Sequence, residues 1–273
     1  MKGICTFFGI SRAAYYAWGK RQTLPDPDRD RKNHILEAYK ATKKRAGYRS
    51  IGLWLRQNRS VVINNKAILR LMRVLGIRSV ARQHRKGPIQ KAAGEAAHTY
   101  PNILSRDFAA AEPNRKWVTD ITFVQTRQGF AYLSPIKDLF GGFIVSYAFS
   151  MTKDTALVAR TIREAMEKEE VTDGLILHSD QGTQYTSYAY FALMKEYSIT
   201  PSMSRRANPW DNAPMESFFS FLKDEAFQDI KIPSFQEAEK IIDEYIHYYN
   251  YERIQLKTRK TPYLARCLSS PIQ

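Results

Sequence analysis

The segment from Asn208 to Glu225, NPWDNAPMESFFSFLKDE, constrains the fold of this chain more than any other. At about 100° per residue its apolar side chains gather on one helical face. These side chains are Met215, Phe218, Phe219 and Leu222. Glu216 and Lys223 lie seven positions apart and share a stripe beside that face. The segment therefore predicts a helix that packs into a core and carries a carboxylate and an ammonium group along one edge.

Two further acids lie in short strand-like segments upstream. Asp120 lies inside KWVTDITFV, and Asp180 follows the apolar run LILHS. Phosphodiester chemistry is well served by two divalent ions about 3.5–4 Å apart, and Mg²⁺ prefers carboxylate oxygens. We expect the three acids to converge on such a pair of ions. Either Asp120 or Asp180 would bridge them, and Glu216 would complete the second ion.

Spacing alone is weak support in a chain that is 25% charged, but the sequence around the acids is specific. Asp180 and Glu216 are separated by 35 residues, and each acid has its own motif. The motifs are WVTDIT at 117–122, HSDQGTQYTS at 178–187, SMSRRANPWDNAPMESFFSFLK at 202–223 and YYNYERIQ at 248–255. Over almost its whole length the chain resembles the OrfB transposases of bacterial insertion sequences, in the insertion-sequence-3 group.

That resemblance implies an α/β fold: a ribonuclease-H-like, mixed five-stranded sheet flanked by helices, as in retroviral integrases, with an all-α, helix-turn-helix-like N-terminal region. It implies that Asp120, Asp180 and Glu216 form a catalytic triad for two Mg²⁺ ions, with Mn²⁺ as a possible substitute. The implied reaction is cleavage at the 3′ ends of a transposable element, followed by strand transfer. Thr183 and Ala207 depart from the family pattern of Ser and Gly. We expect Ala207 to strain its loop by about 1 kcal/mol and to reduce activity without abolishing it.

The local patterns agree with this fold. Residues 123–127, 130–136 and 142–149 predict three strands of an antiparallel meander, because Gln128-Gly129 and Gly141-Gly142 favour turns. Residues 155–169 predict a helix capped by Asp154, and LILH predicts a short buried strand.

Several polar residues near the acids are candidate DNA contacts, each with a structural alternative. His178 either has a role at the site, in which it contacts substrate or orients a ligand carboxylate, or is a satisfied histidine at the sheet edge. Gln184 and Tyr185 either contact the DNA backbone or cap a helix that begins near Thr186. Lys223 either neutralises a phosphate or is a solvated helix lysine.

Three residues of the loop that precedes the Glu216 helix are further candidates for DNA contact. They are Arg205, Arg206 and Asn212.

Charge is concentrated in the first part of the chain. Residues 1–110 hold 23 Lys and Arg against 6 Asp and Glu, whereas residues 111–273 hold 19 against 21. Such asymmetry predicts a nucleic-acid-binding arm on a near-neutral domain. Membrane binding is disfavoured, because no amphipathic helix with basic and aromatic faces is evident and no apolar run approaches the roughly 18 residues of a membrane span.

We expect a DNA-binding region at 1–80, a basic linker at 81–110, a catalytic core at 111–227 and a C-terminal helical extension at 228–273. GISRAAYYAWGKR resembles the second half of a helix-turn-helix, with Ser11 as its N-cap. Helices are expected at 30–44, 50–57 and 65–75, and Arg70 and Arg73 point away from the buried face of the last one. The alternative is a helical hairpin that only scaffolds the core or binds another subunit.

The mixed composition of residues 78–107 predicts a flexible linker rather than a packed element. Ser234 and Glu237 predict a capping box for a C-terminal helix. Tyr248, Asn250 and Arg253 match the family's YN…R signature, for which we favour a structural role over DNA contact. A basic tail is expected from Arg253, Lys257, Arg259 and Lys260.

Two distant cysteines and the lack of a signal-peptide pattern predict a reducing compartment, the bacterial cytoplasm. Five scattered histidines disfavour zinc. The resemblance implies an upstream OrfA partner or a frameshift fusion with it, and synapsis of two DNA ends implies a homo-oligomer. Two rivals stay open: a ribonuclease H that cuts RNA in hybrids, and a non-catalytic DNA-binding regulator of transposition.

Overall fold

The computed structural model describes residues 7, 9–22, 25–80, 98–171, 173–206, 208–228 and 232–267. The chain divides into two compact units, residues 1–78 and residues 79–273. Ala207, whose backbone strain was predicted above, lies outside the described residues. In the parts of the chain that are described, no helix has the length and apolarity needed to cross a membrane.

In its described residues, the first unit contains helices and no strand. They are α2 (Arg12–Gln22), α3 (Arg29–Ala41), α4 (Tyr48–Arg59) and α5 (Asn65–Val74). The last three share a buried core that includes Ile35, Leu55 and Ile68. Ser11 caps α2, because its Oγ accepts a hydrogen bond from the Ala14 N–H at 3.1 Å. The helices expected from apolar spacing are therefore confirmed to within a few residues.

The second unit is built on one mixed sheet. Its strands are β1 (Lys116–Thr119), β2 (Thr122–Thr126), β3 (Gly129–Asp138), β4 (Ile144–Ser150), β5 (Ile176–Ser179) and β6 (Thr200–Met203). β2, β3 and β4 form the expected antiparallel meander, while β1 pairs with β3 antiparallel and with β5 parallel. Six segments replace the expected five strands because the first strand is interrupted at Asp120 and Ile121. The fold class is confirmed.

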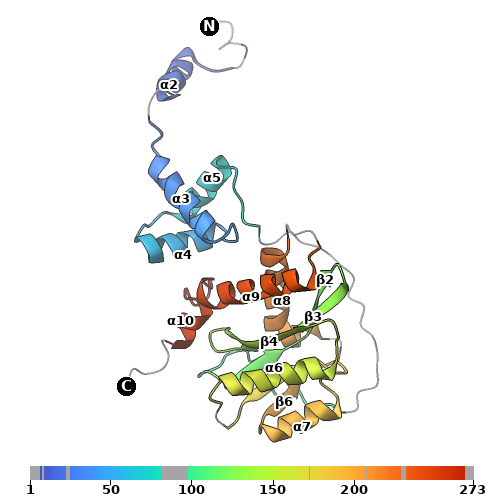
Figure 1. Cartoon of the computed structure of the whole chain (residues 1–273). Helices are drawn as coiled ribbons and strands as arrows, with labels where there is room; N and C mark the ends of the chain where they lie inside the picture. The colour runs from blue at the N-terminus through green and yellow to red at the C-terminus, as the bar shows by residue number, and fades with distance from the viewer. Residues whose placement is uncertain are drawn as a thin grey trace. The chain divides into compact units, whose positions relative to one another are not determined.

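Helices cover both faces of this sheet (Figure 1). α6 (Thr155–Lys168) and α7 (Tyr188–Glu196) pack with Trp117 and Leu177, whereas α8 (Ala213–Ala226) and α9 (Phe235–Tyr251) pack with Val118 and Leu133. Trp117 and Val118 are adjacent in β1, so the alternation of a strand supplies the two cores. A short 3₁₀ helix, η1 (Pro209–Asn212), precedes α8, and α10 (Pro262–Cys267) follows α9.

The residues of the C-terminal signature bind α9 to the sheet and to α8. Asn250 Oδ1 accepts from the Ile144 N–H at 2.9 Å, and its Nδ2 donates to the Ile144 carbonyl at 3.0 Å. Arg253 pairs with the buried Glu225 at 2.9 Å, and the Tyr245 hydroxyl donates to the same carboxylate. The structural alternative is thus favoured. The assignment of Arg253 to a basic tail is wrong, since its side chain is largely buried in this ion pair.

The end of the expected linker is packed, which corrects the prediction of a flexible tether there. We call residues 98–106 the strap. The His98 N–H donates to the Thr186 carbonyl at 3.1 Å, and the Met203 N–H donates to the Pro101 carbonyl at 3.3 Å. Leu104 is buried in the core. Composition did not signal this because the contacts are made by single backbone groups and by side chains whose partners lie far along the sequence. Residues 81–97 lie outside the described residues.

Candidate active site

Two of the three acids follow neighbouring parallel strands. β1 and β5 pair in parallel with Val118 opposite His178, and Asp120 and Asp180 each come two positions later. Both carboxylates therefore belong to the same edge of the sheet. Asp120 Oδ1 accepts from the Ile121 N–H at 2.7 Å, and Asp180 Oδ1 accepts from the Gly182 N–H at 2.8 Å.

The acids act on one another electrostatically. The pKa of Asp120 is raised to about 7, mainly by burial, then by the negative charge of Asp180, with a smaller contribution from Glu216. Lys153 acts in the opposite direction. Tyr185 is buried beside this pair, and its pKa is raised well above the usual value by burial and by the charges of Asp120 and Asp180. Negative charge is thus concentrated at the ends of β1 and β5.

Glu216 reaches this region from the first turn of α8, and its side chain is exposed. Within the described ranges, no three His, Cys, Asp or Glu side chains are already arranged to hold a metal ion. The donor chemistry nevertheless fits Mg²⁺, because all three groups are carboxylates and an added cation would relieve the repulsion that raises the pKa of Asp120. An exposed glutamate can change rotamer, so Glu216 is the one of the three acids that could turn to complete such a set.

Lys223 lies two turns after Glu216 on α8, with its Nζ 4.8 Å from the centre of the Phe123 ring. Loss of hydration lowers the pKa of Lys223, while the charge of Asp120 partly opposes that shift. The ammonium group is therefore within electrostatic reach of Asp120. Its exposed position leaves it accessible to a phosphate.

His178 is fully buried, in agreement with the second of its two alternatives. Its Nδ1 lies 2.9 Å from Ser202 Oγ, and its Nε2 lies 3.0 Å from Ser204 Oγ. Ser202 Oγ also accepts from the N–H groups of Ile103 and Leu104, so its own proton is directed to Nδ1 and Nε2 carries the ring proton. Burial lowers the pKa of His178 to about 4, so the ring is neutral at pH 7.

Gln184 and Tyr185 do not cap the following helix, which corrects that alternative. α7 begins at Tyr188, and Ser187 is its N-cap, because Ser187 Oγ accepts from the Tyr190 N–H at 3.2 Å. Gln184 Nε2 donates to the Lys153 carbonyl at 3.0 Å. Tyr185 is buried, with its hydroxyl 3.3 Å from Thr119 Oγ1. Only Gln184 of the two has a partly exposed side chain.

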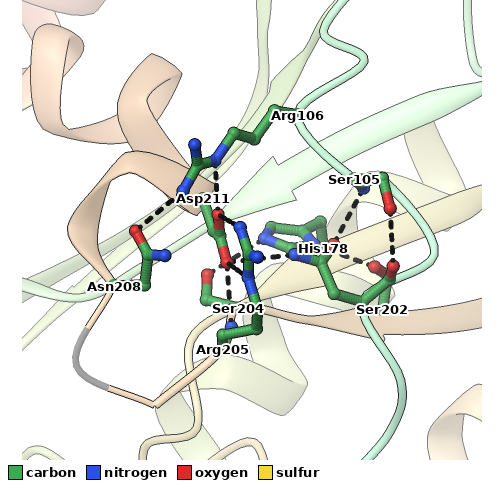
Figure 2. A network of polar contacts seen from close by, with 9 residues as sticks. Ser105, Arg106, His178, Ser202, Ser204, Arg205, Asn208 and Asp211 are labelled. Atoms are coloured by element: carbon green, nitrogen blue, oxygen red, sulfur yellow. Dashed lines mark hydrogen bonds and ion pairs between the residues drawn. The ribbon is translucent and has the colours of Figure 1, made fainter.

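The loop before α8 is organised by Asp211, a residue that the sequence did not single out. Asp211 is fully buried and accepts hydrogen bonds from the side chains of Arg205 and Arg106 (Figure 2). The side chain of Asn102 also donates to it. The side chains of Arg205 and Arg106 hold the pKa of Asp211 well below its usual range. The signal in the sequence was an acid within a loop that contains two arginines, but its burial could not be read from residue types.

The three candidate DNA contacts in this loop have different surroundings. Arg205 binds Asp211 through Nε and Nη2, each at 2.9 Å, although most of its side chain is exposed. Arg206 is exposed. Asn212 is buried, and its Nδ2 donates to the Thr119 carbonyl at 3.0 Å, directly before Asp120. Asn212 Oδ1 is buried with no hydrogen-bond partner among the described residues.

In the first unit, Arg70 and Arg73 are both exposed on α5. Arg70 Nη2 forms an ion pair with Asp28 at 2.6 Å. Both side chains stand away from the buried face formed by Ile68, Leu71 and Met72, as expected.

Comparison with known proteins decides the family. Integrase core domain models match residues 110–209 and 197–254, and an HTH-like domain model matches residues 25–86. The chain is 38% identical over 250 residues to the putative transposase InsK of insertion sequence element IS150 from Escherichia coli, covering 92% of this chain and 87% of InsK. It is 30% identical to the transposase InsF of insertion sequence IS3A from E. coli, covering 82% of this chain and 78% of InsF. The chain belongs to the insertion-sequence-3 family of transposases.

Solved structures agree with the fold of this transposase. A chain of the simian T-cell lymphotropic virus intasome superimposes with a TM-score of 0.50 over 84% of the transposase and 73% of that chain, at 13% sequence identity. At this identity the likeness supports the integrase-type fold alone. The integrase core and the transposase relatives together make the protein a polynucleotidyl transferase with an HTH-like DNA-binding region.

Proposed function

We propose that this transposase cleaves the 3′ ends of its insertion sequence and transfers the freed 3′-OH to another phosphodiester, with Asp120, Asp180 and Glu216 binding two Mg²⁺ ions. The observation that carries the proposal is the placement of Asp120 and Asp180 at one sheet edge, where burial and the charge of Asp180 raise the pKa of Asp120. Mn²⁺ is a possible substitute, since it also accepts carboxylate ligands.

The residues have separate roles in this proposal. Asp120 and Asp180 hold the ions on stiff strand ends, and Glu216 completes the ligand set from α8. Bound Mg²⁺ would supply an activated oxygen nucleophile and would neutralise charge on the leaving oxygen. Lys223 binds a phosphate of the DNA end, with Phe123 supporting its ammonium group. Neither a Ser nor a Tyr nucleophile is required.

DNA is the substrate and also the main partner. Arg70, Arg73, Arg205, Arg206, Gln184 and Asn212 are the further proposed contacts. We also propose that an OrfA product, separate or fused by frameshifting, helps to recognise the element ends, and that two or more copies of the chain assemble on them.

Cleavage of a labelled element end tests this proposal. The wild-type chain and Asp180→Asn are compared in Mg²⁺, each with and without the upstream OrfA product. Cleavage by the wild type only is expected, and equal behaviour of the two chains under both conditions would favour the regulator. An RNA–DNA hybrid of the same sequence should remain intact, and its degradation would favour a ribonuclease H.

A further inference from the structure

The structure assigns to Asp211 and Arg106 a positioning role: together they fix the start of α8, and through it the placement of Glu216 against Asp120. This inference rests on the proposed function of the three acids. It extends the functional site to the strap, which precedes the first strand of the sheet.

Asp211 is a fully buried carboxylate with five donors directed at it (Figure 2). Arg205 supplies Nε, Nη2 and its backbone N–H, at 2.9, 2.9 and 3.0 Å. Arg106 Nε donates at 2.7 Å, and Asn102 Nδ2 donates at 3.1 Å. A carboxylate bound this completely has one position, so the 3₁₀ helix η1 that contains it is held in place.

Arg106 connects two parts of the loop that carries α8. In addition to Asp211, it reaches Asn208 Oδ1 through Nη2 at 3.1 Å. Both acceptors lie within five positions of the first residue of α8. Arg106 therefore binds the residue before η1 and a residue within it, from a segment that precedes all three acids in the sequence.

The backbone of the strap is shaped to deliver this arginine. Ser105 and Arg106 have φ angles of 46° and 64°, in the left-handed region that costs non-glycine residues on the order of 1 kcal/mol each. Asn102 holds the turn, because its Oδ1 accepts from the Ser105 N–H at 2.8 Å and its carbonyl accepts from Ser105 Oγ at 3.1 Å. These two strained residues place the Arg106 side chain on the buried carboxylate of Asp211.

Asn212 transmits the position of η1 to the acids. It follows Asp211 directly and donates to the Thr119 carbonyl, which adjoins Asp120. Four residues later Glu216 leaves the first turn of α8. One side of η1 is thus bound to the strap and the other to the end of β1. Since Glu216 would turn toward Asp120 to complete the ligand set, a shift of η1 would alter its reach.

The test uses the full chain with Arg106→Gln and Asp211→Asn, compared with Asp107→Asn as the matched control. Asp107 adjoins Arg106 but pairs with Lys116, at a distance of 2.8 Å, and not with η1. Hydrogen exchange of residues 208–222 reports the order of η1 and α8, and Mn²⁺ binding followed by electron paramagnetic resonance reports the ligand set.

We expect Arg106→Gln and Asp211→Asn to speed exchange at residues 208–216 and to weaken Mn²⁺ binding on the order of 10–100-fold, the usual range for groups that orient metal ligands. Raised Mg²⁺ should restore cleavage, and the affinity of Arg106→Gln for the DNA end should be unchanged. Asp107→Asn should match the wild type. Arg106 is partly exposed, so Arg106→Gln remains informative if Asp211→Asn fails to fold.

The positioning role would be overturned if Arg106→Gln showed the same hydrogen exchange and the same Mn²⁺ affinity as the control Asp107→Asn. Glu216→Gln separates this result from a failure of the proposed function. If Glu216→Gln binds Mn²⁺ and cleaves DNA as the wild type does, the proposed metal site is wrong, whatever the exchange data show.

Discussion

Gly182 lies against the side chain of Asp180, and the contact leaves no room for a methyl group. A Cβ at this position would be 2.9 Å from Asp180 Oδ1. We expect Gly182→Ala to displace that carboxylate and to slow DNA cleavage on the order of 10–100-fold, with little change in melting temperature. Gly19→Ala is the control, because nothing lies within 4 Å of its Cβ. Wild-type cleavage by Gly182→Ala would show that Asp180 tolerates the shift.

Asp211 makes the free energy of unfolding depend on pH in the acidic range. Its pKa in the folded chain is depressed by the side chains of Arg205 and Arg106, so the unfolded chain binds the proton more readily. The stabilisation is present above the unfolded-state pKa of about 3.9 and is lost as pH falls through the folded-state pKa. Chemical denaturation from pH 6 to pH 3 should show a shallower loss of stability for Asp211→Asn than for the wild type. Parallel pH profiles would contradict this.

Individual residues differ in how far sequence reveals them. Asp120, Asp180 and Glu216 stand in distinctive motifs, so they could be proposed from the sequence. Asp211 lies in one of the same motifs, yet nothing in residue type distinguishes a buried, arginine-bound carboxylate from a solvated one. His178 illustrates the converse, since its candidate role in DNA contact arose from its place beside Asp180, whereas both ring nitrogens are bound inside the protein.

At the scale of elements, the contact of α9 with α8 depends on the carboxylate of Glu225, which is almost completely excluded from water. Arg253→Gln would leave the Glu225 carboxylate without its arginine, and breaking such a pair costs about 3–5 kcal/mol. Because Arg253 is not fully buried and Tyr245 still donates to Glu225, we expect the lower end of that range. Urea denaturation measures the loss.

Arg127→Gln provides the matched comparison for this loss. Arg127 pairs with Glu237 at 3.3 Å, and both side chains are exposed, so the same substitution should cost about 1 kcal/mol or less. Equal losses for the two variants would mean that Arg253 contributes no more than a surface ion pair.

Elements were predictable where one periodic pattern dominated. The spacing of apolar residues located α5, α6, α8 and α9, and the Gly-containing turns located the meander of β2, β3 and β4. The division of the first strand into β1 and β2 was not predicted, because the alternation continues through KWVTDITFV on both sides of Asp120. The packing of the strap was also missed, because it depends in part on backbone hydrogen bonds to β6 and to Thr186, before α7, that leave no trace in composition.

For the molecule as a whole, the separation of charge predicts how DNA binding responds to salt. Arg73 is an exposed residue of α5 in the basic first unit. If it neutralises a phosphate, Arg73→Gln should weaken binding to all duplex sequences alike and lower the slope of log affinity against log salt by about one. Fluorescence anisotropy with the full chain measures both quantities.

Lys195→Gln removes the same charge from an exposed site on α7 in the second unit and serves as the control. We expect its salt slope to equal that of the wild type. A change of slope in Lys195→Gln but not in Arg73→Gln would place the dominant phosphate contacts on the other unit.

The strap also limits how far this enzyme can be truncated from its N-terminal side. The match to the integrase core begins at residue 110, just after Arg106 and Asn102. A fragment trimmed at that border would keep every acid of the proposed triad while discarding two of the donors that neutralise Asp211. Such a fragment would leave Asp211 bound by Arg205 but no longer tied to the strap, so we expect the smallest autonomous catalytic fragment of this protein to start upstream of residue 110.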